Sequence, residues 1–197
     1  VLSFDDLKRD YTSWQYTVVH CDAAWNPTDL WKNEYISGFT DAYIKEYRYS
    51  YNTLQPFVNY SLVLPNDDLN FTLSGNYILM VYPDGEADKP IITRRFMVVE
   101  PGVTVKGDVK QATPIDLRFT HHEVRFSLFT TNYYIAEPYR DLKVVLKQNG
   151  RWDNAIWDLK PLMLRGDELD YQYTDGSNVF EAGNEFRYFD TKSMRYQ

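Results

Sequence analysis

The chain has 197 residues, of which 44% are hydrophobic and 17% aromatic, and its formal net charge at pH 7 is −7. This length suits one large domain or two small ones, and the hydrophobic content is sufficient for a packed core. The acidic balance, without any cluster of basic residues, argues against a protein that binds nucleic acid or an anionic membrane. No stretch approaches the roughly 20 apolar residues of a membrane-spanning helix, and a single cysteine, Cys21, excludes an internal disulfide.

The negative charge is concentrated in the first half of the chain. Residues 1–102 hold 14 acidic and 8 basic side chains, whereas residues 103–197 hold 14 acidic and 13 basic ones. A solvated surface is the simplest explanation, and a basic partner is the alternative. The first residues, VLSFDD, show no features of a signal sequence, so we expect a processed chain or a piece of a longer one.

Strand patterns dominate the first hundred residues, because aromatic and β-branched residues recur between turn signals. The first strong pattern is WQYTVVHC at residues 14–21. One short helix of at most two turns is expected in PTDLWKNEYI, with Thr28 or Asp29 as its cap. Further strands are predicted in EYRYSYN, where tyrosines alternate, in NYSLVLP, in NYILMVYPDG, which is apolar enough for a central strand, and in TRRFMVVEP.

A second set of strands follows Pro101 and Gly102. The predicted segments are VTVKGDV, HHEVRFSLFT, DLKVVLKQNGRWDNAI, ELDYQYTD and NEFRYFD. Asn149-Gly150 is the strongest short hairpin signal, since both residues tolerate the positive φ angles of a type I′ turn. The sequence therefore predicts an all-β protein with two tandem antiparallel β-sandwich domains of immunoglobulin or fibronectin type, at residues 1–101 and 102–197.

The run His20-Cys21-Asp22 is the first candidate for chemistry. In an extended strand, His20 and Cys21 point to opposite faces, so they cannot form a nucleophile–base pair. We expect the end of a core strand, with Cys21 packed inside and with Asp22 and Trp25 beginning a loop.

Other catalytic or metal-binding patterns are equally weak. His121-His122 precedes a strand that separates the two rings, the carboxylate pairs Asp5-Asp6 and Asp67-Asp68 lie next to each other rather than across a cleft, and glycine-rich phosphate loops are absent. The sequence predicts no enzyme, no cofactor and no metal site. Asn59 and Asn70 match the glycosylation triplet, which matters only in a eukaryotic secretory context.

Aromatic residues outside the strands are the best candidates for binding a partner. Trp25, Trp31 and Tyr35 lie in or beside the segment that follows the first core strand. Loop aromatics anchor protein or sugar ligands, but they also seal the edge of a sandwich, and both interpretations remain open. A glycan-binding module is accordingly the alternative function.

Several segments of the chain, taken in order, resemble a known family. They are LSFDDL, DYTSWQYTVVHCDAAW, YRYSYNTLQPFVNYSLVLPN, GNYILMVY and TRRFMVVEP in the first half, and QNGRWDNAI and AGNEFRYFD in the second. Together they resemble the plug protein of the type IX secretion system of Bacteroidetes, over essentially the whole chain.

The resemblance implies a non-enzymatic, monomeric periplasmic protein that is associated with the outer membrane through its partner and is not itself inserted in the membrane. The implied partner is the large outer-membrane β-barrel translocon, whose periplasmic opening the plug occupies. Members of this family are longer than 197 residues, so the chain resembles their first half.

Overall fold

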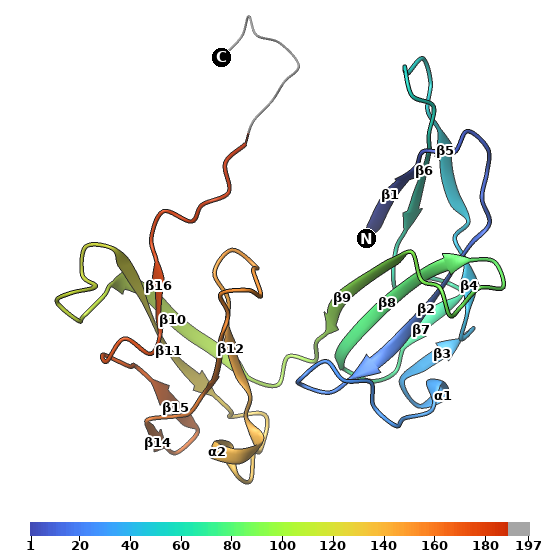
Figure 1. Cartoon of the computed structure of the whole chain (residues 1–197). Coiled ribbons are helices and arrows are strands. Elements are labelled where there is room, and N and C mark those ends of the chain that lie inside the picture. Colours follow the sequence, from blue (N-terminus) through green and yellow to red (C-terminus); the bar gives the residue numbers. More distant parts are fainter. Residues whose placement is uncertain (189–197) are drawn as a thin grey trace, which may run out of the picture. The chain divides into compact units, whose positions relative to one another are not determined.

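The computed structural model describes residues 1–188 and divides the chain into two compact units, Val1–Glu100 and Pro101–Gln197 (Figure 1). Antiparallel strands make up nearly all of the regular structure, which confirms the prediction of an all-β protein. Both helices in the described part, α1 (Lys32–Tyr35) and α2 (Pro138–Asp141), have a single turn. No described helix has the length and the apolar character needed to cross a membrane.

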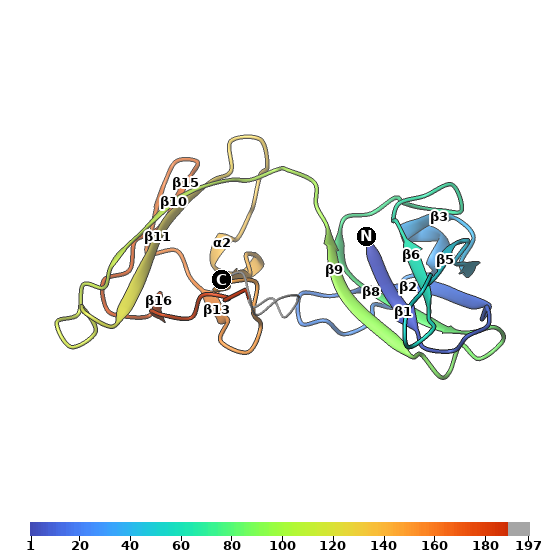
Figure 2. The same ribbon diagram turned by 90° about the horizontal axis from the view of Figure 1, so that it is seen from above.

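The first unit is built from two main sheets, which can be followed in Figure 2. One has the order β1-β6-β5 and the other the order β4-β2-β8-β9, and a small sheet pairs β3 with β7. The strands are β1 (Leu2–Asp6), β2 (Trp14–Cys21), β3 (Ile36–Gly38), β4 (Ala42–Tyr43), β5 (Glu46–Tyr49), β6 (Val58–Leu62), β7 (Leu69–Phe71), β8 (Gly75–Pro83) and β9 (Ile92–Val98).

Alternate residues of β2, β6 and β8 form one core between the two main sheets. The core is rich in tyrosine, and its buried hydroxyls reach backbone carbonyls or, for Tyr16, the side-chain amide of Asn66, as polar groups in an apolar interior must. The hydroxyl of Tyr77 donates to the carbonyl of Leu73 at 2.7 Å, and that of Tyr60 donates to the carbonyl of Thr12 at 3.0 Å. β8 is a central strand, as its apolar run predicted, because β2 pairs along one edge of it and β9 along the other.

The predicted helix of residues 27–36 is shorter than expected, and its predicted caps are wrong. Thr28 is held by β2 instead, because its backbone N–H donates to the carbonyl of His20 at 3.0 Å. The N-cap of α1 is Trp31, whose N–H donates to the side chain of Glu34 at 2.7 Å. Tertiary pairing with the end of β2 therefore replaces the first turn of the expected helix.

The second unit has one larger sheet and one hairpin. The larger sheet has the order β10-β11-β15-β14, and β16 also pairs with β11; the hairpin pairs β12 with β13. The strands are β10 (Thr104–Gln111), β11 (His121–Phe129), β12 (Val144–Leu146), β13 (Ile156–Leu159), β14 (Met163–Arg165), β15 (Glu168–Tyr171) and β16 (Val179–Glu181). A smaller core contains Phe126, Leu128, Leu159, Leu169 and Tyr171.

The turn predicted at Asn149-Gly150 forms, although β12 and β13 pair farther from it than the sequence suggested. Both residues have positive φ, 54° and 73°, and the N–H of Arg151 donates to the carbonyl of Gln148 at 3.0 Å. The strand predicted in NEFRYFD is wrong for residues 184–188, which have no strand, and its last two residues lie outside the described part. The last strand in the described part is β16, which ends at Glu181 and pairs with β11.

Candidate partner-binding surfaces

The run His20-Cys21-Asp22 is the end of a strand, as the alternation predicted. Cys21 is the last residue of β2, and it lies on the face opposite to the core side chains Tyr16 and Val18. Burial raises the pKa of the Cys21 thiol, so the nucleophilic thiolate is disfavoured. His20 points into the core, where its Nδ1 lies 2.9 Å from the hydroxyl of Thr28. Within residues 1–188, no group of three or more histidine, cysteine or acidic residues is placed to hold a metal ion.

Trp25 is held in place by the loop that begins at Asp22. The backbone N–H of Asn26 and then its side-chain amide donate to the Asp22 carboxylate, which lowers the pKa of Asp22. This turn lets Trp25 adopt a φ of 68°. Trp25 is only 7% exposed, and the guanidinium of Arg95 lies 5.0 Å from the centre of its ring. The side chain therefore packs against the domain rather than extending into solvent.

Trp31, the N-cap of α1, and Tyr35, its last residue, face different environments. Tyr35 is buried, and its hydroxyl donates to the carbonyl of Val18 at 3.3 Å. Trp31 is 79% exposed. Lys32 fixes the turn to the sheet, since its Nζ donates to Thr17 at 2.8 Å and pairs with Asp41 at 3.2 Å. Of the three predicted anchors, the structure therefore gives only Trp31 an exposed ring on a fixed backbone.

A second aromatic surface was not identified as a binding candidate from the sequence. We call Tyr11, Tyr47 and Tyr49 the tyrosine face; their side chains are 45%, 42% and 57% exposed. The ring of Tyr47 lies 4.8 Å from that of Tyr11 and 5.8 Å from that of Tyr49, measured between centroids. The alternating tyrosines of EYRYSYN were the signal, but a period of two does not say whether the aromatic side of a strand is covered. Here β5 is at the edge of its sheet and is exposed throughout.

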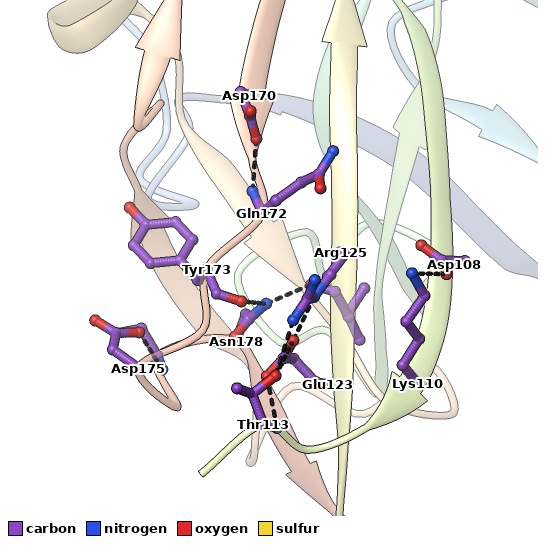
Figure 3. A network of polar contacts seen from close by, with 12 residues as sticks. Asp108, Lys110, Thr113, Glu123, Arg125, Asp170, Gln172, Tyr173, Asp175 and Asn178 are labelled. Carbon is purple, nitrogen blue, oxygen red and sulfur yellow. Dashed lines mark hydrogen bonds and ion pairs between the residues drawn. The ribbon is translucent and has the colours of Figure 1, made fainter.

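A buried ionic network in the second unit is structural in character (Figure 3). Glu123 of β11 is fully buried, and its carboxylate accepts hydrogen bonds from Arg125 Nε at 2.5 Å and from the Thr113 N–H at 3.0 Å. Arg125 Nη2 also donates to the Thr113 hydroxyl at 2.8 Å, which closes the network. These contacts tie β11 to the segment after β10, so we assign the network to the stability of the second unit.

The carboxylate pairs named in the sequence are likewise engaged in local contacts. Asp6 accepts hydrogen bonds from the N–H of Lys8 and the hydroxyl of Thr12, at 3.0 Å each. Asp68 forms an ion pair with Lys45 at 2.6 Å. A hollow of about 420 Å³ in the first unit is lined by residues that include no carboxylate side chain: Val1, Leu2, Ser3, Leu62, Leu64, Leu79, Arg94, Arg95 and Phe96.

Comparison with known proteins identifies the family. Residues 1–100 match the family model described as "Type 9 secretion system plug protein 1st domain". The chain belongs to this family. The first unit, Val1–Glu100, is thus the first plug domain, and the family that the sequence resembles is confirmed. No curated protein matches the chain.

A solved structure extends the similarity beyond the first plug domain. It is the crystal structure, at 2.30 Å resolution, of a hypothetical protein from Parabacteroides merdae ATCC 43184. The two chains are 39% identical with a TM-score of 0.89, and the match covers 94% of the plug chain and 46% of the crystallised one. The plug chain therefore spans less than half the length of this relative.

Proposed function

We propose that this plug component acts without catalysis, by occluding the periplasmic opening of the outer-membrane β-barrel translocon of the secretion system. The match of residues 1–100 to the plug family carries this proposal. The two units described above are compatible with it, because a steric plug requires a folded, water-soluble body rather than a reactive centre.

The first plug domain offers two surfaces for such a contact. Trp31 stands on the anchored turn of α1, and the tyrosine face lies along the edge strand β5. Exposed aromatic side chains on a rigid support lose little conformational freedom on binding, which makes them favourable interface anchors. We assign the primary contact to Trp31, as the more exposed and more isolated ring.

Charge supplies a further expectation for the interface. Residues 1–102 carry a net charge of −6, from 14 acidic and 8 basic side chains. An acidic domain that meets a basic rim associates faster and more tightly at low ionic strength. Affinity for the translocon is therefore expected to fall between low and high salt, and equal affinity at both would contradict this part of the proposal.

The test of occlusion is an electrical one. The purified translocon barrel is inserted into a planar bilayer, and ion conductance is recorded before and after the plug protein is added on the periplasmic side. Closure of the conductance supports the proposal. An open barrel in the presence of bound plug protein refutes occlusion but not association.

Two variants then identify the surface. Trp31→Ala is expected to weaken retention of the barrel on immobilised plug protein at least tenfold, which corresponds to about 1.4 kcal/mol. Tyr49→Ala reports on the tyrosine face, and Val63→Ala, at an exposed residue outside both surfaces, is the matched control. Loss of binding in Tyr49→Ala alone would move the contact to β5.

A further inference from the structure

The second unit covers one face of its main sheet incompletely. Strands β10 and β11 pair along their full length, and the pairs Val105–Leu128, Gly107–Phe126 and Val109–Val124 bring apolar residues to the same face. Within residues 1–188, the hairpin of β12 and β13 is the only other sheet of this unit that can pack on this face. A sandwich requires two apolar faces packed against each other, and two short strands cannot cover this sheet.

A groove remains between the sheet and the hairpin. It has a volume of about 400 Å³ and is lined by β10 and β11 on its floor and by Val144, Val145 and Leu146 of β12 on its wall. A second hollow, of about 300 Å³, shares Val109 and Val124 with the first. It is also lined by residues 147–149 and by Phe180 and residues 182–185, so the chain itself flanks the groove at this end and the uncovered part lies over Val105, Gly107 and Val109.

The groove is bordered by open strand edges. Among the described residues, β12 pairs only with β13 and β10 only with β11, so each has backbone groups free on its other side. All eight residues of β10 are exposed, including Val105 and Val109 at 64% and 63%. A long, exposed, partly apolar edge strand is one that natural proteins normally cover.

The centre of the floor carries no side chain. A Cβ added to Gly107 would lie only 2.7 Å from the carbonyl oxygen of Arg125 and 2.8 Å from the Cβ of Phe126, so close pairing with the neighbouring strand β11 accounts for the glycine. The missing side chain leaves the floor low between Val105 and Val109, where an extended segment can lay alternate apolar side chains.

The length of the crystallised relative indicates what that segment is. Only 46% of that chain is matched by the 197 residues, so more than half of it lies outside the match. We infer that the groove holds a β-strand from the part of the natural polypeptide that follows residue 197, paired with the free edge of β12 and packed on Val105, Gly107 and Val109. Such a strand completes the second layer of the sandwich from within the same molecule, where its effective concentration is high.

The test uses the full natural polypeptide. In the 197 residues alone, Val105 and Val109 are as accessible as many surface side chains, so lysine at either position would cost little. Beneath a docked strand, each lysine would bury an unpaired charge. Val105→Lys and Val109→Lys are therefore each expected to lower the thermal midpoint of the full polypeptide by about 5 °C or more.

Val63→Lys is the matched control, because Val63 is 53% exposed and belongs to the first unit, not to the lining of the groove. It is expected to leave the midpoint within about 1 °C. If the lysine variants do not fold, Val105→Thr and Val109→Thr replace them, with Val63→Thr as the control.

Three outcomes overturn the inference. The first is equal midpoints for the groove variants and the control. The second is an effect that appears only when protein concentration is raised tenfold, since that would identify a second copy as the occupant. The third is a natural polypeptide that ends at residue 197.

Discussion

Glu123 is expected to contribute strongly to the stability of the second unit through its buried ion pair. It is fully buried, yet its side chain is charged, and Arg125 and Thr113 supply its hydrogen bonds. Glu123→Gln keeps the shape of the side chain but removes the charge. Its amide group would also direct N–H donors at the donors of Arg125 and Thr113, which leaves buried groups without acceptors.

The magnitude follows from the burial of the pair. Breaking a buried ion pair costs about 3–5 kcal/mol, and the lower end applies here because the side chain of Arg125 is 24% exposed. We therefore expect Glu123→Gln to lower the free energy of unfolding by roughly 3 kcal/mol, and the thermal midpoint by about 10 °C.

The dependence on pH gives an independent check. Burial acts to raise the pKa of Glu123, but the hydrogen bonds from Thr113 and Arg125 and the charge of Arg125 outweigh it, so the pKa lies below its usual value. An unfolded chain, with a glutamate pKa of about 4.3, binds this proton first as the pH falls. The stabilisation by Glu123 is thus fully present above about pH 5 and is lost as the pH falls through the folded pKa.

The assay is urea denaturation at pH 7 and again at pH 3, for the wild-type chain and two variants. Glu86→Gln is the control, since Glu86 forms an exposed pair with Lys89 at 2.9 Å and is expected to change stability by less than about 0.5 kcal/mol. The difference between wild type and Glu123→Gln is expected to shrink between pH 7 and pH 3. A difference that is small at pH 7, or one that stays constant with pH, would refute the reasoning.

Two further predictions concern the first plug domain. Gly38→Ala is expected to destabilise this domain by at least about 2 kcal/mol, because φ is +104° and the new Cβ would collide with the carbonyl oxygen of Asp68. Gly85→Ala should cost only about 1 kcal/mol, for the backbone strain at a φ of +77°, because no atom lies within 4 Å of the new Cβ. Equal losses for the two glycines in thermal denaturation would contradict the steric argument. Cys21→Ser is expected to lower stability by about 1–2 kcal/mol, because it buries a hydroxyl where a thiol packed, and to leave retention of the barrel unchanged. Loss of retention without loss of stability would instead place Cys21 at the interface.

Much of the strand framework could be predicted from local patterns. The aromatic and β-branched residues at 14–21 and the apolar run at 77–82 identify β2 and β8, because both strands have a paired neighbour on each side and many buried side chains. The turn at Asn149-Gly150 was predictable for a different reason, since positive φ restricts the residues that fit.

The failures have a common cause, which is competition from distant segments. Residues 27–36 do have helical spacing, but the backbone N–H of Thr28 donates to the carbonyl of His20 at the end of β2. No local pattern in the sequence indicates this hydrogen bond. The burial of Glu123 likewise leaves no local signal, because its partner Thr113 lies ten positions away. The candidate anchors divided in the same way, since whether an aromatic ring such as Trp25 or Trp31 is covered depends on the loop around it.

The buried tyrosines of the two units limit the stability of the protein at high pH. Burial raises the pKa of Tyr77 in the first unit and of Tyr171 in the second, each to about 12. In the unfolded chain the same phenols ionise near pH 10, so between these values the unfolded state releases protons that the folded state keeps. Strong alkali therefore destabilises both domains through their buried tyrosines, and the last phenolate absorbance to appear in the ultraviolet, after that of the exposed tyrosines, marks the opening of the cores.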